Sequence, residues 1–308
     1  MTTPQLPAGL QGPQPGRTFL VTGATSGIGQ AAAVALALAG ARVVLAGRSE
    51  TRLAATRKLI ERLEPAARLE SLLVDMASLA SVRAAADSAR ALGPIDLLIN
   101  NAGMYGASDT TADGLDRLQQ TNHFGPFLFT GLLLPQLLQG QRPRVVAVTS
   151  VSHHVPRQPL GTGPLPVREQ EVVTYGRTKL ANLLTTYELQ RRSDLLGLGL
   201  RAMAAHPGFA RTGIVQVGQV LPEGTLRARV GAAIGPLLAQ SAEQGAACTL
   251  LAATADLPGG THVGPRAIVR GEPVVQKTSR LSRDPEAAAR LWEYSEGVVG
   301  HSWPVPLS

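Results

Sequence analysis

Short apolar runs of strand length alternate along this chain with longer stretches that have the composition of helices. The first run leads through a glycine-rich turn into an Ala- and Leu-rich stretch that Gly40 ends, and a second apolar run follows. This order predicts a parallel strand–helix–strand unit. The runs expected to be strands are 17–22, 42–46, 69–75, 94–99, 144–149 and 198–206, and residues 261–269 are expected to form a seventh strand and the loop after it.

The alternation predicts the α/β class, with a doubly wound parallel sheet between two layers of helices. No linker or internal repeat interrupts it, so we expect one domain over residues 17–308, after a flexible Pro- and Gly-rich leader at 1–16. The Pro- and Gly-rich segment 151–173 favours a surface loop that roofs a site. Residues 213–236 suit either a mobile lid over a hydrophobic substrate or a surface helix.

The turn after the first strand has the spacing Gly-x-x-x-Gly-x-Gly and opens directly into a helix. Glycines allow a tight turn and close backbone approach, and the free N–H groups of a helix start attract an anion. In this setting the turn predicts binding of a nucleotide pyrophosphate. The residues expected there are Gly23, Thr25, Ser26, Gly27, Ile28 and Gly29.

A second candidate feature is the pair Tyr175 and Lys179, which are four positions apart and share one face of an expected helix. A free tyrosine has a pKa of about 10, and lowering it to about 7 takes roughly 4 kcal/mol. One cation about 4.5 Å away nearly supplies this energy. The spacing therefore predicts a tyrosine that acts as an acid or base, although such pairs also occur on helices by chance.

Four motifs, in this order, resemble those of the short-chain dehydrogenase/reductase family over roughly residues 17–300. They are Thr-Gly-x-x-x-Gly-x-Gly at 22–29, Asn-Asn-Ala-Gly at 100–103, Tyr-x-x-x-Lys at 175–179 and Pro-Gly-x-x-x-Thr at 207–212. The gap of 25 positions from Ser150 to Tyr175, with its flanking residues, resembles the retinol dehydrogenase and protochlorophyllide reductase branch. The resemblance implies a Rossmann-like sheet of seven parallel strands and hydride transfer between nicotinamide and a carbonyl or alcohol.

The resemblance also implies roles for individual residues. Tyr175 would pass a proton to the substrate oxygen, Lys179 would lower the tyrosine pKa and bind the nicotinamide ribose, and Ser150 would hydrogen-bond the reacting oxygen. Asn122 would hold water in a proton relay. Asp75 would contact adenine, although a turn or N-cap role is equally open. The other residues implied to bind cofactor are Met76, Asn101, Ala102, Gly103, Pro207, Gly208 and Thr212.

The end of the second strand bears on the choice of cofactor. An acidic residue there would bind the ribose 2′-hydroxyl of NAD, but this chain has Arg48, which can pair with a 2′-phosphate. We therefore expect NADP(H), with NAD less favoured. A sensor that holds NADP without turnover, and an epimerase or dehydratase on the same scaffold, are the alternatives.

His153 and His154 also suggest a metal or serine-hydrolase site, but no Gly-x-Ser-x-Gly motif or acid or cysteine cluster accompanies them, so no metal is expected.

The amino-acid composition limits which classes of binding partner are expected. Hydrophobic residues make up 44%, which is typical of a globular protein, and no segment is apolar enough to predict a membrane helix or a signal peptide. The net charge of +7 comes from scattered arginines, so nucleic acid is not an expected partner, whereas an anionic small molecule is. The single Cys248 fits a reducing, cytoplasmic location. In many members of the family the helix faces at 111–138 and 175–192 pair subunits, so a homo-oligomer is one of the states that the sequence allows.

Overall fold

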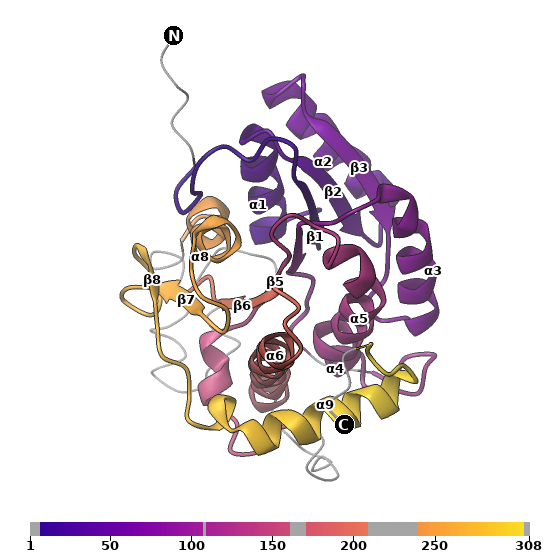
Figure 1. Cartoon of the computed structure of the whole chain (residues 1–308), viewed down its shortest axis with the longest axis vertical. Coiled ribbons are helices and arrows are strands. Elements are labelled where there is room, and N and C mark those ends of the chain that lie inside the picture. The colour runs from indigo at the N-terminus through magenta and orange to yellow at the C-terminus, as the bar shows by residue number, and fades with distance from the viewer. Residues whose placement is uncertain (1–6, 107–108, 161–170, 209–239, 305–308) are drawn as a thin grey trace, which may run out of the picture.

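A twisted sheet of eight strands runs through the centre of the protein (Figure 1). A computed structural model describes residues 7–106, 109–160, 171–208 and 240–304. Within these residues the strand order is β3-β2-β1-β4-β5-β6-β7-β8. The strands are β1 (Thr18–Thr22), β2 (Arg42–Gly47), β3 (Arg68–Leu73), β4 (Leu97–Asn100), β5 (Arg144–Val148), β6 (Arg201–Ala205), β7 (His262–Pro265) and β8 (Pro273–Val275).

The first seven strands are parallel, as the alternation of strands and helices predicts, and the eighth is not. β8 pairs antiparallel with β7, in a register that places Val275 opposite Val263. The expectation of seven strands was therefore one too few. A three-residue edge strand has no room for a hydrophobic period, so it is recognised only from its pairing with β7.

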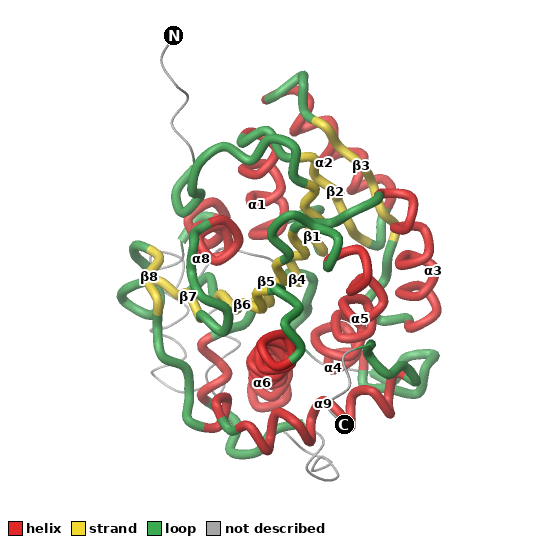
Figure 2. Tube along the Cα trace, in the orientation of Figure 1, coloured by secondary structure: helices red, strands yellow, loops and turns green. Residues whose placement is uncertain are grey.

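Helices cover both faces of the sheet, which gives the three layers expected (Figures 1 and 2). One face carries α1, α2 and α8, and the other carries α3, α5 and α6. Each layer buries its own apolar core against the almost fully buried strands β1, β4 and β5. The helices of these two layers are α1 (Gly27–Leu38), α2 (Glu50–Leu63), α3 (Leu79–Ala89), α5 (Gly125–Leu137), α6 (Glu171–Leu195) and α8 (Ala242–Thr254).

The last helix, α9 (Pro285–Val299), crosses the outer side of α6 and reaches α5 (Figure 1). It begins as its sequence predicts, because the Asp284 carboxylate accepts hydrogen bonds from two first-turn amides and Pro285 follows. Its Trp292 is fully buried, with the Arg192 guanidinium 4.4 Å from the ring centroid. The C-terminal helix therefore packs on α5 and α6, the two helices that the family resemblance offered for pairing subunits.

The segment before β1 packs on the domain from residue 7 onward, whereas a flexible leader was expected over residues 1–16. Leu10 is buried against the α1 and α8 layer, and the Gln14 amide donates to the Ala39 carbonyl at 2.7 Å. The Gln11 amide donates to Thr254 Oγ1 at 2.9 Å. Its Pro and Gly content predicted disorder, but one apolar side chain and several backbone hydrogen bonds hold this stretch in place. Residues 1–6 lie outside the described part.

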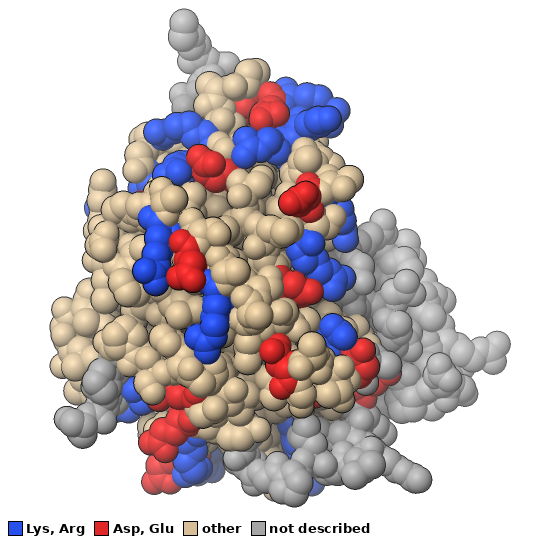
Figure 3. Space-filling view, turned by 90° about the vertical axis from the view of Figure 1, so that its right-hand side faces the viewer, with Lys and Arg blue, Asp and Glu red and all other residues tan. Residues whose placement is uncertain are grey.

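Surface charge is dispersed. The face that carries β3 and α3 shows basic and acidic side chains interspersed over a mostly uncharged surface (Figure 3). This matches the interpretation of the net charge as a solvated arginine-rich surface and gives no basic stripe on that face. Within the described residues, no helix combines the length and the apolar character needed to cross a membrane.

Candidate active site

The carboxyl ends of the central strands bring the predicted site residues together, as expected for an open parallel sheet. The glycine turn follows β1, the Asn-Asn-Ala-Gly segment follows β4, and Ser150 follows β5. The Thr22 hydroxyl links the glycine turn to the Asn-Asn-Ala-Gly segment, because it accepts hydrogen bonds from the amides of Asn101 and Ala102, both at 3.0 Å. The Asn101 side-chain amide donates back to the Thr22 carbonyl at 2.8 Å.

The glycine turn requires glycine for two reasons. Gly23 and Gly27 have φ angles of 68° and 55°, in the left-handed region that favours glycine. Gly29 permits close packing instead: a Cβ there would lie 2.4 Å from the Gly23 carbonyl oxygen and 2.3 Å from Asn101 Nδ2. The turn is therefore held against the end of β4 with no room for a side chain.

The start of α1 has free hydrogen-bond donors. Ser26 occupies the N-cap position, but its side chain caps no first-turn amide, and the first turn contains no acidic residue. The N-cap side chains of α2, α3, α8 and α9 all accept hydrogen bonds from their helices. An uncapped helix start beside a glycine turn fits a pyrophosphate group.

Arg48 and Asp75 lie at the ends of neighbouring strands. Arg48 is exposed just after β2 and forms no ion pair with any described residue. Asp75 acts as a turn residue, because its Oδ1 accepts a hydrogen bond from the Ala77 amide at 2.9 Å. Met76 is buried after it, with its carbonyl oxygen packed against Gly125. The adenine contact implied for Asp75 and Met76 stays a prediction.

Tyr175 and Lys179 lie on the buried face of α6, next to the end of β5. Tyr175 is 7% exposed, and the side chain of Ser150 is near enough to its hydroxyl to lower the tyrosine pKa. Lys179 is 4% exposed; its Nζ lies 5.6 Å from the Tyr175 ring centroid and donates to the Val148 carbonyl at 3.0 Å. The predicted triad of tyrosine, lysine and serine is therefore assembled.

Burial sets the protonation of this pair. It raises the pKa of Tyr175 to about 12, against a smaller lowering by the nearby Ser150 side chain. Burial also lowers the pKa of Lys179 to about 8. The expectation that Lys179 nearly suffices to bring the tyrosine pKa to about 7 does not hold for the chain without its cofactor, because the loss of solvent has the largest effect on Tyr175. Tyr175 is consequently a protonated phenol, ready to donate.

Asn122 lies in a π-helical turn, η2 (Gln120–Phe124), between the short α4 (Arg117–Gln119) and α5. Such turns widen a helix locally, which agrees with the local role expected for an asparagine inside a helix. Its Oδ1 accepts from the Met104 amide at 2.7 Å, and its Nδ2 donates to the Met104 carbonyl at 2.9 Å and to Thr178 Oγ1 at 3.1 Å. Asn122 thus joins the end of β4 to the helix that carries Tyr175.

Gly103 lies between the side chains of Asn122 and Lys179. A Cβ on Gly103 would be 3.1 Å from Asn122 Oδ1 and 3.5 Å from Lys179 Nζ. Pro207 and Gly208 follow β6 at the same edge, where the Gln240 side chain donates to the Pro207 carbonyl at 3.1 Å. Thr212, the segment 213–236 and residues 161–170 of the expected roof lie outside the described residues.

The sequence motifs did not identify two residues that contact this site. Tyr105 presents its ring edge-on to Tyr175, with 5.2 Å between the ring centroids. Its position two residues after Asn-Asn-Ala-Gly was the available signal. Thr178 links Asn122 to the Tyr175 carbonyl, to which its hydroxyl donates at 2.8 Å. It lies inside the Tyr-x-x-x-Lys motif, at a position that the motif leaves unspecified.

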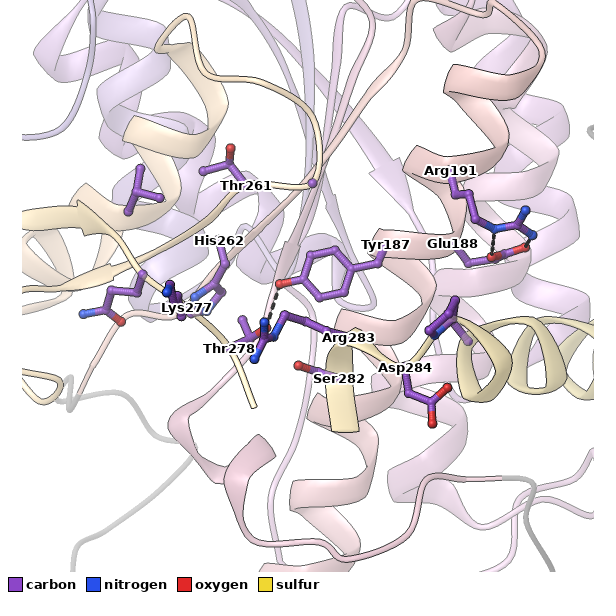
Figure 4. A pocket seen from close by; sticks show the side chains of 15 residues that line it. Tyr187, Glu188, Arg191, Thr261, His262, Lys277, Thr278, Ser282, Arg283 and Asp284 are labelled. Carbon is purple, nitrogen blue, oxygen red and sulfur yellow. Dashed lines mark hydrogen bonds and ion pairs between the residues drawn. The ribbon is translucent and has the colours of Figure 1, made fainter. Parts of the chain in front are cut away.

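A separate cavity of about 460 Å³ lies along the second half of α6, bounded by β7, β8 and the start of α9 (Figure 4). It contains none of the predicted site residues. Within the described residues, no group of three or more His, Cys, Asp or Glu side chains is placed to hold a metal ion. Six of the residues that line the cavity are Tyr187, His262, Lys277, Thr278, Arg283 and Asp284.

The fold and this site define a nicotinamide-dependent oxidoreductase of the Rossmann type. The short chain dehydrogenase family model matches residues 17–218, more than half of the chain, and the chain belongs to that family. Among its relatives, mouse polyprenol dehydrogenase is 37% identical over 93% of this chain and 84% of its own length. Human retinol dehydrogenase 12 is 32% identical over 94% of this chain and 88% of its own length, which supports the expected branch.

A crystal structure of an uncharacterised protein from Mycobacterium paratuberculosis is also similar. It has a TM-score of 0.76 and 36% sequence identity, and the match covers 98% of both chains. The two proteins therefore share the architecture that the described residues form. The sensor and the epimerase or dehydratase are not favoured, because the relatives are named as dehydrogenases.

Proposed function

We propose that this protein is an NADP(H)-dependent oxidoreductase that interconverts a carbonyl and an alcohol on a small apolar substrate. The observation that carries the proposal is the placement of buried Tyr175 and Lys179 next to Ser150, at the sheet edge where α1 has its uncapped start. Two relatives are named for retinol and for polyprenol, which are apolar alcohols. The apolar segment 213–236 agrees with such a substrate.

The residues present fit the cofactor. The first turn of α1 would hold the pyrophosphate, Lys179 the nicotinamide ribose, and Arg48 the 2′-phosphate. Bound nicotinamide supplies or accepts the hydride. Tyr175 donates its proton to the oxygen of the carbonyl as reduction proceeds, because its hydroxyl is protonated at neutral pH. Ser150 donates a hydrogen bond to the same oxygen. Asn122 and Thr178 fix the turn of α6 that carries Tyr175.

The proposal is tested by following NADPH absorbance with a panel of apolar aldehydes and ketones that includes retinal and a polyprenal. We expect turnover with wild-type protein and a loss of at least about a hundredfold in Tyr175→Phe, since the general acid is removed. The NADPH dissociation constant should change little in this variant. Activity retained by Tyr175→Phe would refute the acid role, and tight NADPH binding without turnover on any substrate would favour the sensor.

The choice between NADP and NAD rests on Arg48. We expect wild-type protein to bind NADPH more tightly than NADH, because the guanidinium pairs with the 2′-phosphate. Arg48→Asp should reverse the preference, since a carboxylate repels the phosphate and accepts from a free 2′-hydroxyl. Dissociation constants for both cofactors, with exposed Arg52→Asp as the control on the neighbouring helix, measure the effect. A wild-type preference for NADH would contradict the assignment.

A further inference from the structure

Ser150 is held through its main chain as well as its side chain. It begins the 3-10 turn η3 (Val151–His154) in an extended conformation, and its Oγ accepts a hydrogen bond from the Ser152 amide at 3.2 Å. Its carbonyl oxygen accepts from two groups of His153: the amide at 3.1 Å and the ring Nδ1 at 2.6 Å. The imidazole of His153 therefore reinforces the backbone of the predicted catalytic serine.

The hydrogen bonds of His153 fix its tautomer. Because Nδ1 faces a carbonyl oxygen, Nδ1 carries the proton and Nε2 is left as an acceptor. The Ser279 amide indeed points at Nε2, at 3.4 Å. The ring is 2% exposed, and burial lowers the pKa of His153 to about 4, which agrees with a neutral imidazole. Each ring nitrogen thus has one partner, and the partners lie on different segments.

Ser279 belongs to the segment between β8 and α9, next to Thr278. Thr278 Oγ1 shares a hydrogen bond of 2.9 Å with the Tyr187 hydroxyl on α6, and both residues line the large cavity (Figure 4). The η3 turn itself is pressed onto α6, since a Cβ on Gly176 would lie 2.6 Å from the Ser152 carbonyl oxygen. His153 therefore joins the Ser150 turn to the C-terminal segment at one point.

We propose that His153 is a positioning residue for Ser150: its Nδ1–H holds the Ser150 carbonyl so that the serine hydroxyl faces Tyr175. His153 acts only through the serine, and this inference rests on the proposed function. Two fixed hydrogen bonds to one carbonyl restrict the rotation of the residue that bears it, which fixes the main chain from which the Ser150 side chain extends. Loss of the ring bond leaves the backbone bond alone and loosens that alignment.

Replacement of His153 by asparagine or by glutamine tests the roles of the two ring nitrogens separately. The side-chain nitrogen of His153→Asn can occupy the place of Nδ1 and donate to the Ser150 carbonyl. The amide of His153→Gln extends to the place of Nε2 and keeps only the Ser279 contact. His153→Leu removes both contacts. His154→Gln is the matched control, because His154 is the exposed neighbour whose ring lies 4.0 Å from that of His153.

We expect His153→Gln and His153→Leu to lower kcat about tenfold, the effect of one hydrogen bond, with KM and the NADPH dissociation constant nearly unchanged. His153→Asn and His154→Gln should stay close to wild type. Equal kcat in all variants would overturn the inference. So would equal losses in the Asn and Gln variants together with lowered stability, because His153 would then only support packing.

A second measurement does not depend on turnover. The ¹⁵N spectrum of the imidazoles, assigned with His153→Asn, should show His153 as the neutral tautomer protonated at Nδ1. A ring protonated at Nε2 would overturn the inference whatever the activity. If wild-type protein turns over no substrate, the proposed function fails, while the tautomer still decides the contact between His153 and Ser150. Turnover that Ser150→Ala abolishes but His153→Gln leaves intact would reject the positioning role alone.

Discussion

The chemistry of single residues here depends on burial as much as on spacing. The interval between Tyr175 and Lys179 predicted that the two side chains share a helix face, and they do. The interval carries no information on burial. Loss of solvent is what raises the pKa of Tyr175 and lowers the pKa of Lys179. In the chain without cofactor, Tyr175 is therefore prepared to donate a proton in carbonyl reduction rather than to accept one.

The lowered pKa of Lys179 leads to a pH dependence of cofactor binding. A lysine is charged below its pKa, so the contribution of this charge is complete well below pH 8 and is lost as the pH rises through about 8. We expect the NADPH dissociation constant to rise about fivefold across this range, because a hydrogen bond from a charged donor becomes a neutral one. Fluorescence titration of NADPH between pH 6.5 and pH 9.5 measures the change.

Lys179→Arg provides the comparison, since arginine keeps its charge over the whole range. Its affinity for NADPH can be weaker overall, but it should show no inflection near pH 8. An inflection of the same size and position in both proteins would assign the titration to another group.

At the scale of elements, the strand ends and the turns that follow them were predictable from the sequence. Glycine spacing, the Asn-Asn-Ala-Gly segment and the serine after β5 each depend on a few neighbouring residues, and local patterns record such requirements. The eighth strand, the packed segment at 7–16 and the π-helical turn at Asn122 depend on contacts with distant elements. A single sequence without its fold does not record those contacts.

The contact between α1 and the end of β4 allows a test at this scale. Gly29→Ala places a methyl group 2.4 Å from the Gly23 carbonyl oxygen, so the helix has to move away from the turn. We expect a loss of about 1–3 kcal/mol in unfolding free energy and weaker NADPH binding. Urea denaturation and NADPH titration measure the two effects.

Gly297→Ala is the matched control for Gly29→Ala. Gly297 is exposed within α9, and a Cβ there would meet nothing within 4 Å. Alanine at this position should stabilise the helix by about 0.5–1 kcal/mol and leave cofactor binding unchanged. Similar behaviour of the two alanine variants would show that the close approach at Gly29 is not needed.

At the scale of the whole molecule, the C-terminal helix closes the side of the domain that carries the catalytic helix. Trp292 of α9 packs edge-on against Phe127 of α5 at 5.2 Å and against Trp303 at 4.5 Å, measured between ring centroids. The His123 ring, in the same π-helical turn as Asn122, shares a hydrogen bond of 2.8 Å with Ser295. α9 thus supports the two elements that position Tyr175 and Asn122, in addition to covering an apolar face.

Trp292 is the largest fully buried side chain in this contact between α9 and the domain. Trp292→Ala should lower the unfolding free energy by about 3–5 kcal/mol, because the ring is fully buried and leaves a large cavity. The loosened helix would expose the apolar faces of α5 and α6, so we expect this variant to bind a hydrophobic dye and to associate as its concentration rises. Tyr294→Ala, at a position 44% exposed on the same helix, is the control and should do neither. Thermal unfolding, dye fluorescence and sedimentation at several concentrations measure these effects. A wild-type protein that already pairs through α5 and α6 would contradict the role of α9, since the helix would have to leave that face for a second subunit to bind.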